Sequence, residues 1–333
     1  MIVASKMITK GVNLMKKILS MALITVMTVS LLTGCVKKTN DTTKATKKIK
    51  IGVCISDFND KFTSYMIDGM KNYSKSLNDV EVVYVDSKHD SNIELSHVKN
   101  FISEGVDAIV VQPVDTDTSK PLTDIAKVAK VPIISVNKPF ANQNDAASYV
   151  RSDLKQSGIL EMEYLAKKVN YKGNVAIIMG TIGQEAQRLR IQSFREVIAK
   201  YPNMKIVGEQ TAEWDRDKSM ALMENWLQSG KDINVVASSN DEMAIGALIA
   251  IEAAGKSGKI IVGGIDATPE ALDYLKSGKL AVTVFQDATA QGQSTIETAV
   301  KVARGENVEK IVIFPYELVA PEDADKYIAK WEK

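Results

Sequence analysis

The chain alternates short apolar runs with longer amphipathic stretches over most of its length. The apolar runs have strand length and few polar residues, which is typical of strands buried on both faces of a parallel sheet. They are residues 51–55, 80–85, 108–111, 133–136, 175–179, 206–207, 235–237, 260–262, 281–285 and 311–314. Apolar residues recur at helical spacing between them, in residues 62–77, 93–104, 122–128, 154–169, 190–200, 220–227, 244–254 and 289–304.

This alternation predicts an α/β fold built from two doubly wound parallel sheets. A barrel of eight equal strand–helix units is disfavoured, because residues 149–152 insert a short extra extended piece into the series. No sequence repeat with a fixed period is found. A chain of 333 residues with 45% hydrophobic composition is large enough for about two domains.

The first residues follow the pattern of an export signal. Met15-Lys16-Lys17 is a charged n-region, and residues 18–32 are apolar but too short and too often interrupted by Ser and Thr for a spanning helix. They end in Leu32-Thr33-Gly34-Cys35, which resembles a bacterial lipobox. That resemblance implies cleavage before Cys35 and a lipid on its thiol; an ordinary signal peptide or a buried helix is the alternative.

Residues 1–34 are therefore expected to be a signal peptide, with Met15 as the alternative start. Residues 35–49 are rich in Lys, Thr and Asn and form the expected lipidated, flexible tether. Removing the signal takes away four lysines and no acid, which changes the formal net charge from +1 to −3. Nucleic acid is then an unlikely partner. With Cys35 lipidated, Cys54 has no disulfide partner and is expected to be a small buried hydrophobic residue.

Polar side chains suited to binding hydroxyl groups follow the carboxyl ends of several predicted strands, where ligands bind in parallel α/β sheets. Carboxylates, amides and guanidinium groups offer paired donors or acceptors in a plane, and aromatic rings cover the apolar faces of a sugar ring. The pattern predicts a site for a small polyol. Its members are Asp60, Phe62, Asn137, Lys138, Arg190, Trp214, Asn240, Asp266 and Gln286.

Residues 239–247 are the best defined part of this pattern. Ser239 and Glu242 have capping-box spacing, which predicts that a helix begins there, and Met243, Ala247, Leu248 and Ile251 lie on one helical face. Asn240 thus falls where a strand ends and a helix begins. Each member of the set has a structural alternative: a helix cap for Asn240 or Asp60, a turn for Asp266, the core for Phe62 or Trp214, and a solvated helix face for Arg190.

Residues 238–247 and 262–269 closely resemble motifs of the periplasmic binding proteins for ribose and for galactose/glucose, and residues 209–215 and 282–287 match too. The similarity runs from about Lys50 to Ala320. It implies two α/β lobes joined by a three-crossing hinge, with a ligand between the lobes. The first lobe is expected to comprise residues 50–152 with 287–316, and the second residues 153–286 with 317–333. The similarity further implies a partner, an ABC permease with its ATPase. We expect a non-enzymatic monomer without cofactor, and the lipobox pattern places it on the outer face of the cell membrane, held by its lipid.

The resemblance also assigns roles to single residues. Asp60 and Phe62 match an acid and a stacking aromatic of the first lobe, and Asn137-Lys138 resembles the pair of the galactose/glucose proteins. Arg190, Asn240 and Asp266 match hydroxyl-binding positions, Trp214 the stacking residue of the second lobe, and Gln286 the hinge-side amide.

Departures from the family pattern concern the ligand and the metal. Residues 169–174 carry no carboxylate where the hexose proteins have a calcium loop, so no calcium is expected. Gln184 and Ala186 replace a His and an Asp, which disfavours glucose and galactose. Residues 57–62, with Trp214 and Asn137-Lys138, are similar to members assigned to inositol or inosamine-type cyclitols. A cyclic polyol or hexopyranose is therefore expected before a furanose pentose.

Other function classes fit the sequence less well. Sugar-responsive repressors share the fold but need an N-terminal DNA-reading module, which the signal and tether replace. The only histidines, His89 and His97, match no strand end of the predicted site, and residues 180–183 lack the pattern of a phosphate loop. A receptor that presents its ligand to a chemoreceptor or sensor kinase is the remaining alternative.

Overall fold

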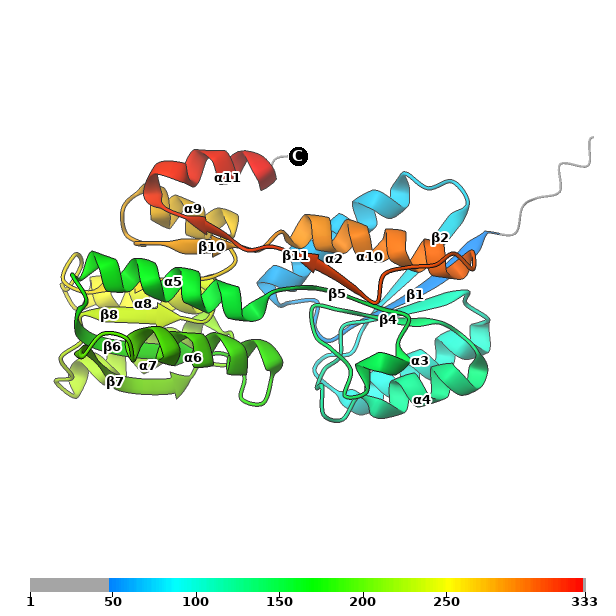
Figure 1. The fold of residues 1–333 in the computed structure, drawn as a ribbon, viewed down its shortest axis with the longest axis horizontal. Coiled ribbons are helices and arrows are strands. Elements are labelled where there is room, and N and C mark those ends of the chain that lie inside the picture. The colour runs from blue at the N-terminus through cyan, green and yellow to red at the C-terminus, as the bar shows by residue number, and fades with distance from the viewer. Residues whose placement is uncertain (1–47, 332–333) are drawn as a thin grey trace, which may run out of the picture. The chain divides into compact units, whose positions relative to one another are not determined.

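The computed structural model describes residues 48–331, which belong to one compact unit (Figure 1). The predicted signal peptide, Cys35 and nearly all of the predicted tether lie outside the described residues. Two sheets organise the described part, and we refer to the elements around each sheet as the N-lobe and the C-lobe.

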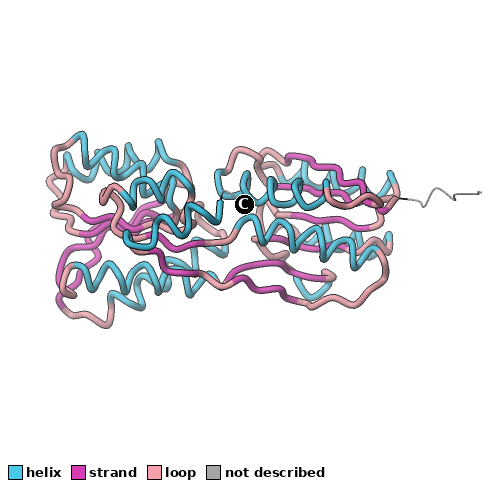
Figure 2. The backbone as a smooth tube through the Cα atoms, turned by 90° about the horizontal axis from the view of Figure 1, so that it is seen from above, coloured by secondary structure: helices cyan, strands magenta, loops and turns pink. Residues whose placement is uncertain are grey.

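The N-lobe sheet has six parallel strands in the order β2-β1-β3-β4-β5-β11. Side chains of α2 and α10 share one apolar cluster with this sheet, and side chains of α3 and α4 share another. Figure 2 shows helices on both sides of the strands. Cover on both faces explains why β3 and β4 are apolar at nearly every position. The elements are β1 (Ile49–Ile55), α2 (Lys61–Lys75), β2 (Val80–Asp86), α3 (Ser91–Glu104), β3 (Ala108–Val111), α4 (Lys120–Ala129), β4 (Ile133–Val136), a 3-10 turn (Gln143–Asp145), β5 (Ser148–Ser152), α10 (Ala288–Ala303) and β11 (Ile311–Phe314).

The C-lobe sheet has four parallel strands in the order β7-β6-β8-β9. Single parallel bridges join Gly263 to Val282 and Asp266 to Phe285, and β12 pairs antiparallel with β10. Helices α5 and α6 cover one face, and α7, α8, α9 and α11 cover the other. The elements are α5 (Leu154–Lys168), β6 (Lys172–Met179), α6 (Glu185–Ile198), β7 (Asn203–Thr211), α7 (Arg216–Gln228), β8 (Val235–Ser238), α8 (Asp241–Ala253), β9 (Ile261–Gly263), α9 (Pro269–Lys276), β10 (Thr283–Phe285), β12 (Glu317–Val319), a 3-10 turn (Pro321–Asp323) and α11 (Ala324–Trp331).

The chain passes between the lobes three times. It does so at residues 152–153 after β5, at residues 286–287 after β10, and at residues 315–316 after β11. Because β5 and β10 both leave their sheets at the carboxyl end, the carboxyl ends of the two sheets face each other. The crossings lie beside the predicted boundaries, and we keep as a proposal the division into residues 50–152 with 287–316 and residues 153–286 with 317–333.

The predicted fold class, two doubly wound parallel sheets, is confirmed. All predicted strands and helices are present, with ends that differ by a few residues. The largest difference is β7, which was predicted as two residues and is nine residues long. Only Met204 in it is buried, so its exposed and half-buried polar positions gave no continuous apolar run. The sequence pattern missed β12, α9 and α11, which are three to eight residues long.

Two expectations about α8 were wrong. Asn240, not Ser239, caps this helix, because its Oδ1 accepts the hydrogen bond from Met243 N at 2.9 Å. Glu242 does not complete a capping box and instead pairs with Arg216 at 2.9 Å. The helix is also buried nearly all round rather than on one face, since it lies between α7, α9 and the sheet.

Candidate functional site

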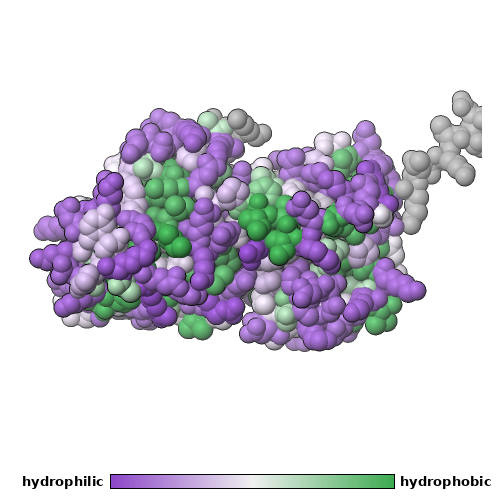
Figure 3. Space-filling model, in the orientation of Figure 1, coloured by the Kyte–Doolittle hydropathy of each residue, from purple (hydrophilic) through white to green (hydrophobic). Residues whose placement is uncertain are grey.

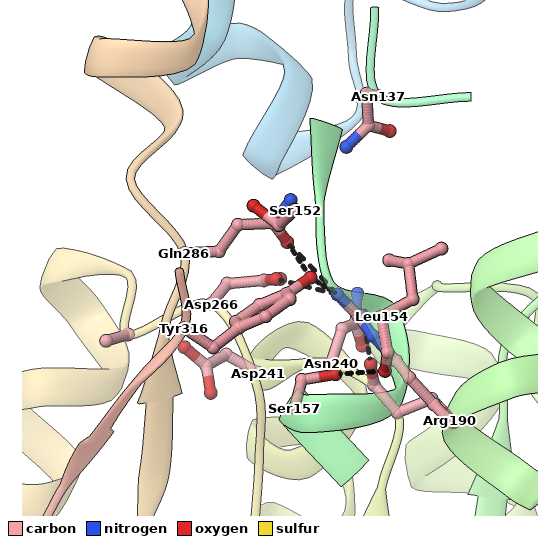
Figure 4. Close-up of polar contacts among 12 residues, drawn as sticks. Asn137, Ser152, Leu154, Ser157, Arg190, Asn240, Asp241, Asp266, Gln286 and Tyr316 are labelled. Carbon is pink, nitrogen blue, oxygen red and sulfur yellow. Dashed lines mark hydrogen bonds and ion pairs between the residues drawn. The ribbon is translucent and has the colours of Figure 1, made fainter. Parts of the chain in front are cut away.

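A cavity lies between the facing carboxyl ends of the two sheets. About 680 Å³ there is free of protein atoms, a volume that includes space open to solvent. Every predicted ligand-binding residue lines it. The complete lining is Ser56, Asp60, Phe62, Thr63, His89, Gln112, Asn137, Lys138, Leu154, Gln184, Glu185, Ala186, Arg190, Trp214, Asn240, Asp266 and Gln286. Figure 4 shows Asn137 of the N-lobe apart from the C-lobe group around Arg190.

Asp60 and Phe62 come from the start of α2. Asp60 caps this helix, because its Oδ1 accepts a hydrogen bond from Thr63 N at 2.7 Å. Phe62 is 9% exposed and belongs to the apolar cluster beneath the sheet. The structural alternatives for both residues are therefore real, yet both side chains also face the cavity, so the two roles coexist.

Asn137 and Lys138 form the turn after β4. Asn137 has a left-handed backbone (φ 63°), which Asn adopts more readily than most residues. Its Oδ1 accepts a hydrogen bond from Gln112 Nε2 at 3.2 Å. Lys138 Nζ donates to Ser56 Oγ at 3.3 Å, and burial lowers the pKa of this amine although Asp60 and Glu94 oppose the shift. The N-lobe thus presents a cation and an amide side by side.

Arg190 is the centre of the C-lobe part of the site and is 4% exposed. Its Nη1 donates to Ser239 O at 2.6 Å, and its Nη2 donates to Gln286 Oε1 at 3.0 Å and to Tyr316 Oη at 2.8 Å. The Asp266 carboxylate lies 3.8 Å from Nη2. A buried charge needs such partners, which hold the guanidinium in place. Figure 4 shows Gln286, Tyr316 and Asp266 around Arg190. The alternative of a solvated helix face for Arg190 is wrong.

Asp266 follows β9 on a turn with unusual backbone geometry. Its φ is 123°, and the next residue, Ala267, has φ 51°. Backbone bonds to Val284 and Gln286 and a bond from Ala267 N to Thr283 Oγ1 hold this strained turn. Burial raises the pKa of the Asp266 carboxyl well above its usual range, and the nearby Arg190 opposes that shift. The fold therefore maintains both a strained backbone and a buried acid at one point of the cavity.

Trp214 forms a wall of the C-lobe side. It also has a left-handed backbone (φ 67°), and its Nε1 donates to Gln184 Oε1 at 2.8 Å. The ring lies close against Gly180, where an added Cβ would come within 2.0 Å of Cζ2. Gln184, singled out in the sequence as a departure from the hexose proteins, thus orients an aromatic wall.

Asn240 serves its own helix as well as the cavity. Besides capping α8, its Nδ2 donates to Trp214 O at 3.3 Å, and the residue is 6% exposed. One amide hydrogen and part of the acceptor capacity of Oδ1 remain for a ligand. Asn240 therefore positions both a helix and the Trp214 backbone at the edge of the site.

The sequence reasoning missed several residues of the site. Ser56 and Gln112 directly follow β1 and β3, so the strand-end rule could have found them. His89 lines the cavity mouth from a left-handed turn after β2, with its Nε2 3.0 Å from Asp57 Oδ2. Tyr316 lies at the third crossing, and no local pattern marked it.

Two buried acids support the site from behind. Asp241 accepts hydrogen bonds from Thr283 Oγ1 at 2.7 Å and from Thr268 N at 2.8 Å, which ties the start of α8 to the Asp266 turn. Burial raises the pKa of Asp241 to about 7. Glu161 Oε1 accepts from Ser238 N at 3.1 Å, and burial raises its pKa well above the usual range.

Groups associated with other chemistries are not assembled in the described part. Residues 48–331 contain no group of three or more His, Cys, Asp or Glu side chains arranged to hold a metal ion. Within the same residues, none of the helices combines the length and apolar character that crossing a membrane requires. Cys54 is fully buried as predicted, and burial raises the pKa of its thiol to about 12, which makes it unreactive.

Comparison with known proteins places the chain among binding proteins. A family model described as a periplasmic binding protein domain matches residues 51–307. A putative rhizopine-binding protein of Rhizobium meliloti is 38% identical over 84% of this chain and 93% of its own length. A ribose import binding protein of Bacillus subtilis is 32% identical over 91% of this chain and 99% of its own.

A solved structure agrees with this result. The solute-binding protein of an ABC transporter from Bacillus halodurans, determined with bound myo-inositol, is 44% identical and superposes with a TM-score of 0.83, covering 86% of this chain and 99% of its own. The family model spans most of the described residues, from within β1 to α10, and includes all residues that line the cavity; the edge strand β11 lies beyond it. The chain belongs to the periplasmic binding protein family, whose members bind solutes and are not enzymes.

Proposed function

We propose that this protein captures one small polyol, a cyclic polyol or a hexopyranose, between its two lobes and delivers it to the permease of an ABC transporter. The observation that carries the proposal is the composition of the cavity. Planar polar groups come from both lobes, and Phe62 and Trp214 supply an aromatic wall on each side. Such a site grips ring hydroxyls, and an analogue that lacks one hydroxyl leaves a buried polar group unpaired.

One relative supports a cyclic polyol, and another supports polyols more generally. The Bacillus halodurans protein described above holds myo-inositol, a cyclic polyol. A protein of Mycolicibacterium smegmatis that is 32% identical over 88% of this chain is named for binding xylitol, an open-chain polyol. The names of these relatives concern solute binding and import, which supports transport over the sensing alternative.

The test is calorimetry and thermal unfolding of purified, ligand-free protein with a panel of inositols, hexoses and pentoses. One member should bind and raise the unfolding temperature, because a ligand that binds the folded state alone stabilises it by mass action. We expect myo-inositol to bind more tightly than ribose. A panel in which no member shifts the transition would refute polyol binding, and tightest binding of ribose would refute the preference for a cyclic polyol.

Binding is proposed to close the lobes, because a ligand that contacts both lobes favours the arrangement in which both contacts form. Side chains already meet across the lobes: the rings of Tyr65 on α2 and Trp331 on α11 lie 4.6 Å apart, and Tyr149 Oη lies 3.4 Å from Glu185 Oε2. Small-angle scattering should report a smaller radius of gyration on saturation, and an unchanged radius would contradict closure.

The proposed location is the outer face of the cell membrane, with a lipid on Cys35 and a monomeric binding domain. The support is the order of charged residues, apolar run and Leu-Thr-Gly-Cys in the sequence. Expression in a bacterial host should give a membrane-associated protein whose N-terminal peptide carries the mass of a lipid. The Cys35→Ala variant should lose both properties, and release of the unmodified wild-type protein into the medium would refute the anchor.

A further inference from the structure

A row of hydrogen bonds runs from Lys138 through Ser56 and Gln112 to Asn137 in the interior of the N-lobe. Lys138 Nζ lies 3.3 Å from Ser56 Oγ, and Ser56 Oγ lies 2.9 Å from Gln112 Oε1. Gln112 Nε2 lies 3.1 Å from Thr63 Oγ1 and 3.2 Å from Asn137 Oδ1. Gln112 is 2% exposed, so its amide depends on these partners.

The directions of these hydrogen bonds follow from Lys138 and from the burial of Ser56. A lysine ammonium can only donate, so Ser56 Oγ accepts from it. The hydrogen of this buried hydroxyl then needs an acceptor, and Gln112 is its other side-chain partner among residues 48–331. The atom of Gln112 that receives this hydrogen must be the amide oxygen. Its Nε2 group therefore faces Asn137, and the atom of Asn137 that accepts must be Oδ1. Asn137 Nδ2, which has no partner among residues 48–331, is left for the cavity.

In the C-lobe, too, a cation orients an amide side chain. Arg190 donates to Gln286 Oε1 at 3.0 Å, and Tyr316 Oη, which accepts from Arg190, donates to the same oxygen at 2.8 Å. Gln286 Nε2 is buried and has no partner within the described residues. One amide from each lobe thus turns a donor toward the cavity, and in each case a cation fixes the orientation.

We propose that Gln112 is a positioning residue that fixes Asn137 as a hydrogen-bond donor to the ligand, so that this corner of the site accepts an oxygen substituent and rejects a protonated amine. The inference rests on the proposed function, because it assigns the substituent that the same site takes. A hydroxyl or a ketone oxygen can accept from Nδ2, whereas an ammonium group has no lone pair and would also meet Lys138 nearby. The ligand expected here is a neutral polyhydroxylated ring.

The test compares the affinity for myo-inositol with the affinities for two analogues. In one analogue a ketone replaces one ring hydroxyl, and in the other an ammonium group does. For each analogue, the positional isomer that binds most tightly is used. Wild-type protein should bind the ketone at least about tenfold more tightly than the ammonium analogue, as expected for one unpaired buried group. In Gln112→Glu, the new carboxylate can only accept, so Asn137 must turn Nδ2 toward it and present Oδ1 to the ligand. The affinity for the ketone should then fall at least about tenfold relative to that for myo-inositol, because a hydroxyl can rotate to donate to Oδ1 and a ketone cannot.

Two further variants complete the design. Asn137→Asp presents an acceptor while Gln112 is unchanged, and it should shift the ketone-to-inositol ratio in the same direction even if Gln112→Glu folds poorly. Gln143→Glu is the matched control, because the oxygen of Gln143 already accepts from Ser135 Oγ and Phe140 N and the residue does not line the cavity. The ketone-to-inositol affinity ratio of this control should equal that of the wild type.

The ketone-to-inositol ratio compares two neutral ligands, so the added charge of the variants does not move it. An unchanged ratio in both Gln112→Glu and Asn137→Asp, with myo-inositol still bound, would overturn the role of Gln112 and leave the proposed function standing. Tighter binding of the ammonium analogue than of the ketone by the wild type would overturn the rejection of amines. Wild-type protein that binds no polyol of the panel removes the proposed function and this inference with it.

Discussion

Gly180→Ala should displace the Trp214 wall of the site with little harm elsewhere. An added Cβ would lie 2.0 Å from Cζ2 and 2.2 Å from Cε2 of the indole. Carbon atoms in contact need about 3.5–4.0 Å, so the ring must move by roughly 1.5 Å. Its 2.8 Å hydrogen bond to Gln184 would then be lost, at about 1 kcal/mol, in addition to about 1–3 kcal/mol for overpacking.

We therefore expect urea denaturation without ligand to show a loss of about 2–4 kcal/mol in the free energy of unfolding. Calorimetry with the tightest-binding polyol of the panel should show affinity reduced about 10–100-fold, since an aromatic anchor in a binding site contributes more than about 1 kcal/mol. Gly208→Ala is the matched control, because its added Cβ would lie 3.2 Å from Trp226, away from the cavity. Wild-type affinity in Gly180→Ala would show that Trp214 does not contact the ligand.

Three other outcomes are expected. Asp266→Ala should abolish detectable binding in calorimetry while thermal unfolding stays cooperative, and retained affinity would remove Asp266 from the site. Burial raises the pKa of both Asp241 and Glu94 to about 7, so the folded protein holds protons that the unfolded chain releases above about pH 4. The free energy of unfolding should thus fall by about 5 kcal/mol between pH 5 and pH 8, about 2.5 kcal/mol from each group, and a rise over this range would contradict the assignment. Trp331→Phe keeps an aromatic ring against Tyr65 but loses the 2.8 Å bond to Ala267 O, so affinity should fall about threefold to tenfold, and an unchanged Kd would exclude support of the Asp266 turn by Trp331.

Much of the fold was predictable, because strands buried on both faces leave a continuous apolar run that survives in a single sequence. β3 and β4 were predicted to the residue for this reason. β12 and α11 were not, because each is short and owes its structure to partners distant in the chain, such as the antiparallel pairing of β12 with β10. The single apolar face predicted for α8 failed because a helix with neighbours on all sides has no polar face to reveal its orientation.

The candidate site was predictable as a set of positions but not as a set of contacts. The strand-end rule identified Asn137, Arg190 and Asp266, all of which line the cavity. The helix-cap alternative correctly anticipated that Asn240 bonds its own helix, but no rule could show that Gln112 and Tyr316 orient neighbouring amides. Those facts depend on distances between side chains from different elements, for which the order of residues along the chain carries no signal.

The three passages of the chain between the lobes bear on the order in which the protein folds. The edge strand β11 of the N-lobe is made only after the whole C-lobe sheet, and Ser148 Oγ bonds Glu309 O across 161 residues of sequence. Helix α10, which shares an apolar cluster with α2, also comes from this late segment. Pairings this distant along the chain slow folding. The nascent chain should thus remain open to chaperones and proteases until its last quarter is synthesised, and neither lobe should fold from a simple truncation at residue 152 or residue 286.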